Sequence, residues 1–196
     1  MTARPTVLVL AVALCVPVVE GARAQSPEQQ TVDAQLAAPK LDASVTITGL
    51  DLTATPLKQI VESIAKAGGV TVRYHSAVTN LDTPSAVKLS NARIEDALRT
   101  VLDPKTLAFK ATGAKSVFIY PDTPANREKY SDSVRTFTIV KADLIVLVTT
   151  VNRSLTGGAD DLRPTIVSMR EPRTITVRAT PDTMAKIAKV IADNDK

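Results

Sequence analysis

The C-terminal segment, residues 174–196, constrains the fold most, because a strand pattern passes there directly into a helix pattern. Apolar residues alternate with threonine and arginine over 174–179, which is the period of a half-buried strand. Thr180 can accept the first free N–H groups of a helix, and Pro181 has the backbone angle that a first helical turn needs. Apolar residues then recur at helical spacing, at Met184, Ile187 and Ile191. We therefore expect a strand followed by an amphipathic helix.

The N-terminal residues have the pattern of an export signal. Arg4 gives a positive start, residues 7–19 are almost continuously apolar, and residues 22–24 offer small side chains for cleavage. The apolar run is short for a membrane span. We therefore expect a signal peptide at 1–24 that is removed on export, with an uncleaved anchor as the alternative.

Composition limits how the remaining chain can be stabilised. Cys15 is the only cysteine and lies in the expected signal peptide, so no disulfide is expected in the exported chain. Aromatic residues make up 3% of the chain and Trp is absent, so the cores must be built from Val, Ile, Leu and Ala. The net charge of +4 gives no electrostatic reason to favour nucleic acid or an anionic membrane surface.

Residues 42–122 show the alternating pattern of a small α+β domain, after a polar stretch at 25–41 that we expect to be a flexible leader. The predicted order is β-α-β-β-α-β-β. The first helix is expected to start at Thr55-Pro56 and to end at Gly68-Gly69, and Asn91 is the expected cap of the second. The remaining segments show strand patterns, at 45–52, 70–74, 86–89, 107–111 and 116–120.

Residues 134–196 predict a second small domain after a polar linker at 123–133. The expected order is β-α-β-β-α, the topology of KH-like RNA-binding domains. A helix is expected at 141–154 although β-branched residues there lower helix propensity, and a glycine-containing loop is expected at 156–163. The predicted fold class is thus α+β with two small domains.

Both predicted domains resemble parts of one protein family. The first resembles the short N-terminal domain shared by secretins and some TonB-dependent receptors. This resemblance rests on Leu52 to Ile64, VTVRYH at 70–75, VKLSNARIEDALRTVL at 87–102 and FKATGAKSVFIYPD at 109–122. The second, with its strand, Thr-Pro start and final helix, resembles the N1-type, KH-like domain of secretins, the outer-membrane channels of bacterial secretion and pilus systems.

The resemblance implies a periplasmic module that works through contacts with other proteins and associates with the outer membrane. Implied partners are a secretin barrel subunit supplied by another chain, inner-membrane secretion or pilus components, and further copies of the chain in a ring. No barrel segment follows Lys196, so the chain is expected to lack the pore itself. Arg73 and Arg178, on the polar faces of two predicted strands, are the candidate partner-binding residues.

Catalytic chemistry has little support in the sequence. His75 is the only histidine, and a base or ligand of this kind needs a partner residue. Glu95 and Asp96 are neighbours on a predicted helix, where adjacent side chains diverge. No spacing of Cys, His and carboxylates fits a metal site. We therefore expect no enzymatic activity, no metal and no cofactor.

Nucleic-acid binding is also not expected, despite the KH-like topology. A KH domain clamps the phosphate backbone with a Gly-x-x-Gly loop. Here Gly157-Gly158 is followed closely by Asp160-Asp161, whose charge repels phosphate. Two other classes remain open. One is a signalling module like the N-terminal domain of TonB-dependent receptors, and the other is a free-standing periplasmic enzyme or ligand binder.

Overall fold

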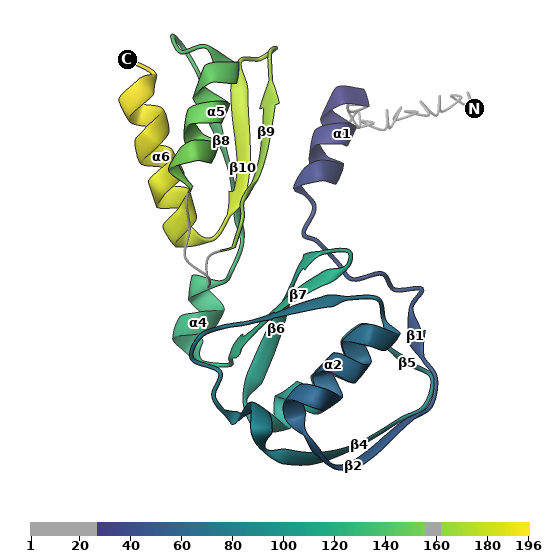
Figure 1. Cartoon of the computed structure of the whole chain (residues 1–196). Helices are drawn as coiled ribbons and strands as arrows, with labels where there is room; N and C mark the ends of the chain where they lie inside the picture. The colour runs from purple at the N-terminus through teal and green to yellow at the C-terminus, as the bar shows by residue number, and fades with distance from the viewer. Residues whose placement is uncertain (1–26, 156–161) are drawn as a thin grey trace, which may run out of the picture.

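The structure is a computed structural model that describes residues 27–155 and 162–196 (Figure 1). The expected signal peptide at 1–24 lies outside the described residues, as does most of the expected loop at 156–163. The described chain is a mixed α+β protein with two domains, each built around its own apolar core.

The first domain consists of short strands around two helices. In chain order its main elements are β1 (Thr46–Ile47), β2 (Leu50–Pro56), α2 (Leu57–Ala67), β3 (Thr71–Tyr74), β4 (Pro84–Leu89), β5 (Ala92–Arg93), α3 (Ile94–Leu102), β6 (Leu107–Gly113) and β7 (Ser116–Pro121). β1 pairs with β5 and β2 with β4, both antiparallel. The third sheet has the order β3-β7-β6, with β3 parallel and β6 antiparallel to β7.

The core of this domain lies between the two helices and the sheets. Apolar residues at helical spacing form the buried face of α2, where Leu57, Ile60 and Ile64 are fully buried. It packs against the buried face of α3 and against strands β2 and β3. Gly69, just beyond α2, has a φ of +63°, which glycine adopts at low cost where a helix ends.

The expected helix caps of this domain are not formed. Pro56 ends β2, because the pairing with β4 continues through Thr55 and Pro56, and α2 begins only at Leu57. The Thr55 hydroxyl donates to the Thr53 carbonyl, 3.1 Å away, instead of accepting from the helix. Asn91 lies in the turn between β4 and β5 with a φ of +51°, and Arg93 directly precedes α3.

The second domain is a three-stranded sheet with two helices on one face (Figure 1). Its elements are β8 (Ser133–Thr138), α5 (Leu144–Ser154), β9 (Thr165–Met169), β10 (Thr174–Ala179) and α6 (Pro181–Asn194). β10 lies in the middle, antiparallel to both β8 and β9. Its Ile175 and Val177 are fully buried beneath α5 and α6.

Thr180 precedes α6 as expected, with Pro181 in the first turn, but its side chain does not cap the helix. The Thr180 hydroxyl donates instead to the hydroxyl of Thr183, 3.0 Å away. Both threonines are buried, and the two hydroxyls satisfy each other inside the domain.

Two helices occur where the sequence showed no helical period. α1 (Pro27–Leu36) lies within the expected flexible leader and contacts β9. α4 (Pro124–Lys129) lies within the expected linker, and the Thr123 hydroxyl caps it by accepting from the Asn126 N–H at 3.2 Å. Short or weakly amphipathic helices give little periodic signal, because tertiary contacts and caps stabilise them.

Candidate functional site

The most exposed large apolar side chains of the described chain lie at the start of α5. Val140 in the preceding loop is 70% exposed, and Ile145 and Val146 in the first turn are 65% and 64% exposed. We call these three residues the α5 patch. The opposite face of the same helix holds the buried Leu147 and Val151. α5 is therefore apolar on both faces over its first turns.

Two aspartates hold the backbone of the α5 patch. Asp143 Oδ1 caps α5 by accepting the N–H groups of Ile145 and Val146 at 2.9 and 3.0 Å. The carboxylate of Asp195, just after α6, accepts the backbone N–H groups of residues 140–142 at 2.9, 2.7 and 2.8 Å. These bonds lower the pKa of Asp195 below its ordinary 3.8, with the Ala142 N–H as the largest cause. The patch is thus presented on a fixed loop.

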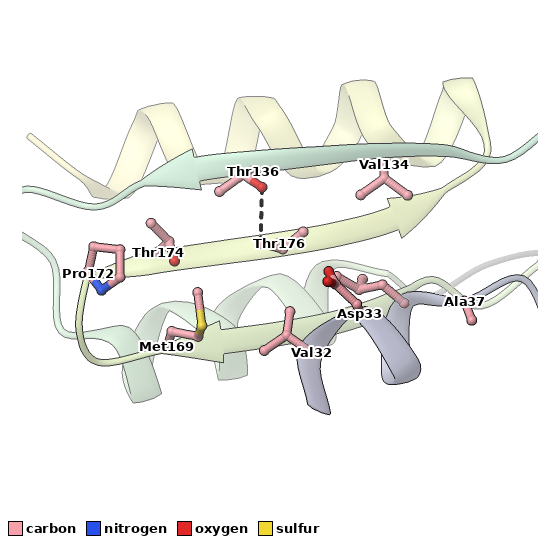
Figure 2. Close-up of a pocket in the computed structure, with 10 residues that line it drawn as sticks. Val32, Asp33, Ala37, Val134, Thr136, Met169, Pro172, Thr174 and Thr176 are labelled. Atoms are coloured by element: carbon pink, nitrogen blue, oxygen red, sulfur yellow. Dashed lines mark hydrogen bonds between the residues drawn. The ribbon is translucent and has the colours of Figure 1, made fainter. Parts of the chain in front are cut away.

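A groove lies on the other face of the sheet, beside α1 (Figure 2). Its volume is about 490 Å³. The floor carries threonines of β8 and β10, and the Thr136 and Thr176 hydroxyls are 3.1 Å apart. Thr174 is only 6% exposed, and its hydroxyl has no hydrogen-bond partner in the described part of the chain. Val32 and Asp33 of α1 form the facing wall.

β8 is an outer strand of this sheet, with β10 on one side only. Residues 133–136 are exposed, and Val134 is 57% exposed. The free side of an outer strand presents backbone N–H and C=O groups that a strand from another chain can pair with. β8 therefore adds a second type of contact surface to the same domain.

Arg73 and Arg178, the residues singled out from the sequence, line one cavity at the junction of the two domains. The Arg73 guanidinium carbon lies 5.6 Å from the centre of the Phe118 ring. Arg178 donates to the Ala37 carbonyl at 2.6 Å and to the Thr165 hydroxyl at 3.3 Å. Sequence reasoning did not single out Lys110, Asp132 or Arg163, which line the same cavity and lie far apart in the chain.

His75 lies in an aromatic cluster rather than beside a catalytic partner. Its Nδ1 accepts the Ala77 N–H at 2.9 Å, and its ring centre is 5.8 Å from that of Tyr130 and 6.1 Å from that of Phe118. Within 27–155 and 162–196, no group of three or more His, Cys, Asp or Glu residues is placed to hold a metal ion. Among the same residues, no helix combines the length and apolar composition needed to cross a membrane.

No protein-family model matches the chain, and no curated protein matches it. Among solved structures, the chain is similar to the type IV competence pilus secretin PilQ of V. cholerae, with 16% identity and a TM-score of 0.32 over 75% of this chain and 38% of that one. It is similar to the N-terminal domain of the secretin XcpQ from Pseudomonas aeruginosa, with 12% identity and a TM-score of 0.28 over 76% of this chain and 65% of that one.

The InvG N0N1 segment in the Salmonella SPI-1 injectisome gives 12% identity and a TM-score of 0.35 over 79% of this chain and 98% of that one. The regions matched in the PilQ and XcpQ chains, described above, span less than two thirds of each of those chains. Similarities of this size assign no function and no site residue to the present chain.

Proposed function

We propose that this protein is a non-enzymatic periplasmic module that binds other proteins during assembly of a secretin-type secretion or type IV pilus system. The observation that carries the proposal is the α5 patch. A helix that is apolar on both faces is normally covered on both faces, because exposed apolar surface gains free energy on burial. In the described chain only the Leu147 face is covered.

The geometry of the patch favours a protein partner. Asp143 and Asp195 already fix the patch backbone, so little conformational entropy is lost when a partner binds. The outer strand β8 lies in the same domain and offers backbone pairing in addition. An apolar patch and a strand edge on one small domain are features of a chain that assembles with neighbours, including further copies of itself.

The class of partner rests on the sequence resemblance to secretin N-terminal domains. We place the two domains at 42–122 and 134–196, since each range holds most of one buried core. The partners we propose are a secretin barrel subunit or inner-membrane components of the same secretion or pilus machinery. The periplasmic location rests on the export pattern of residues 1–24.

Site-specific photo-crosslinking in cells tests the proposal. A photoreactive residue placed at Ile145 should crosslink to an identified secretin, to a secretion or pilus component, or to a second copy of the chain. The matched control is the same residue at Lys189, which is exposed on α6. Equal crosslinking from both positions, or none from Ile145, would argue against the α5 patch as the contact surface.

A charge substitution in the α5 patch tests the proposed function in a second way. Ile145→Glu should abolish the crosslink obtained from a probe at Val146, while the free energy of unfolding changes by no more than about 0.5 kcal/mol, because the side chain is exposed. Leu147→Ala, on the buried face of α5, should cost about 2–5 kcal/mol. Crosslinks confined to residues 42–122, with an inner-membrane regulator, would favour the signalling alternative.

A further inference from the structure

The cavity at the domain junction is lined by more positive than negative charge. Its volume is about 210 Å³. Among its described lining residues, the charged side chains are Asp132 and the cations Arg73, Lys110, Arg163 and Arg178. Arg73 and Lys110 belong to strands β3 and β6 of the first domain. Arg163 and Arg178 belong to the second domain.

Two of these cations are largely buried and share one carboxylate. The Lys110 and Arg178 side chains are 17% and 11% exposed. Lys110 Nζ is 2.6 Å from Asp132 Oδ1, whereas Arg178 Nε is 3.9 Å from Asp132 Oδ2, beyond hydrogen-bond distance. Burying a cation costs free energy unless a countercharge lies beside it. Among the described residues, Asp132 therefore pairs closely with Lys110 and leaves Arg178 with only a longer contact to negative charge.

The other contacts of Arg178 do not supply that charge. Its two terminal nitrogens donate to the Ala37 carbonyl and the Thr165 hydroxyl, which are both neutral acceptors. Ser116, also in the cavity wall, accepts from the Thr112 hydroxyl at 2.9 Å and so has its own O–H to donate. The cavity thus combines guanidinium groups with a hydroxyl donor, which are the groups that bind phosphate in proteins.

We propose that this cavity binds a small phosphate-type oxyanion, which supplies the missing countercharge and joins the two domains. The cavity is smaller than the 300–1,000 Å³ or so of pockets for drug-sized ligands, so inorganic phosphate or a small phosphomonoester fits it best. Because the cations come from both domains, the bound anion holds the domains in one arrangement. This site is independent of the assembly role proposed above.

Isothermal titration of the purified protein tests the site directly. Inorganic phosphate and glycerol phosphate are titrated separately at constant ionic strength, with chloride as the reference anion. We expect one phosphate per chain. Tighter binding of the ester would identify a phosphomonoester as the natural ligand, and tighter binding of phosphate would identify the free ion.

The variants Arg163→Gln and Arg73→Gln each remove one cavity cation and should weaken binding by about tenfold, as expected for a charge-assisted hydrogen bond. Arg153→Gln, an equal charge change on exposed α5, is the matched control and should bind like the unchanged protein. Circular dichroism checks that each variant is folded. No binding at millimolar phosphate, binding of acidic peptides but not phosphate, or equal weakening in all three variants would overturn the proposal.

Discussion

Asp195 is a single side chain that holds a loop more than fifty residues away in the chain. Its carboxylate accepts the N–H groups of Val140, Lys141 and Ala142. Those N–H groups immediately precede α5 and have no partner within a helix or a strand. One carboxylate therefore completes the backbone hydrogen bonding of the segment that presents the α5 patch.

Asp195→Ala should lower the midpoint of urea unfolding at neutral pH, because three backbone donors lose a charged acceptor. The folded-state pKa of Asp195 is lowered from 3.8, so its stabilisation is fully present above that value and is lost as the pH falls through the lower folded-state pKa. The difference between the two proteins should therefore shrink below about pH 4. Asp193→Ala, at an exposed pair with Lys196, is the control and should change little.

Gly68 shows a different constraint, set by a neighbour rather than by its own backbone. Its φ of −86° suits any residue, but a Cβ there would lie 2.1 Å from Cδ1 of the buried Ile94. Gly68→Ala should thus destabilise the chain by about 1–3 kcal/mol through overpacking. Ile94→Val removes Cδ1, so the double variant should cost clearly less than the sum of the single changes in a chemical-denaturation cycle. Additive costs would show that Ile94 is not the obstacle.

At the scale of the element, β10 has two faces with opposite chemistry. Ile175 and Val177 face the helices, whereas Thr174 and Thr176 face the groove beside α1. The two threonines differ in hydrogen bonding. The Thr176 hydroxyl pairs with that of Thr136, while the buried Thr174 hydroxyl has no hydrogen-bond partner among the described residues.

The two threonines should therefore respond in opposite directions to the same substitution. Thr174→Val removes a buried hydroxyl that makes no bond and should stabilise the chain by about 1 kcal/mol. Thr176→Val deprives Thr136 of its partner and should destabilise by a similar amount. Thermal unfolding of the two variants measures this, and a loss of stability in Thr174→Val would mean that its hydroxyl is satisfied in solution.

At the scale of the whole molecule, Asp132 connects the domains. It follows α4, pairs with Lys110 of the first domain and lies 3.9 Å from Arg178 of the second. The neighbouring apolar cluster of Phe118, Tyr120, Tyr130 and Leu162 likewise contains residues from both sides of the junction. The relative placement of the domains thus depends on a few residues rather than on a continuous core.

Asp132→Asn should lower the free energy of unfolding by about 2 kcal/mol, because it leaves two largely buried cations without a carboxylate. Asp51→Asn, at the exposed Lys88 pair, is the matched control and should change it by less than about 1 kcal/mol. Added phosphate should stabilise Asp132→Asn more than the unchanged protein, if the cavity binds anions as proposed. Equal effects of the two substitutions would contradict the role given to Asp132.

The sequence by itself determined the α+β class and the buried helix faces, because apolar spacing directly reports which side of a helix or strand faces a core. The buried faces of α2, α3 and α6 carry apolar residues at helical spacing, and that of α6 includes the predicted Met184, Ile187 and Ile191. The helix caps predicted at Thr55, Asn91 and Thr180 are not formed. Thr55 lies in a paired strand, Asn91 lies in a turn, and the Thr180 hydroxyl bonds to a neighbouring hydroxyl instead.

Only the tertiary structure decided which distant residues meet. Arg73 and Arg178 were singled out on separate strands, but the structure places them in one cavity with Lys110 and Asp132. The loop fixed by Asp195 and the contact of α1 with β9 also join distant segments. Such pairings leave no periodic signal, because periodicity describes neighbours within one element, whereas charge balance and docking depend on how whole elements pack together.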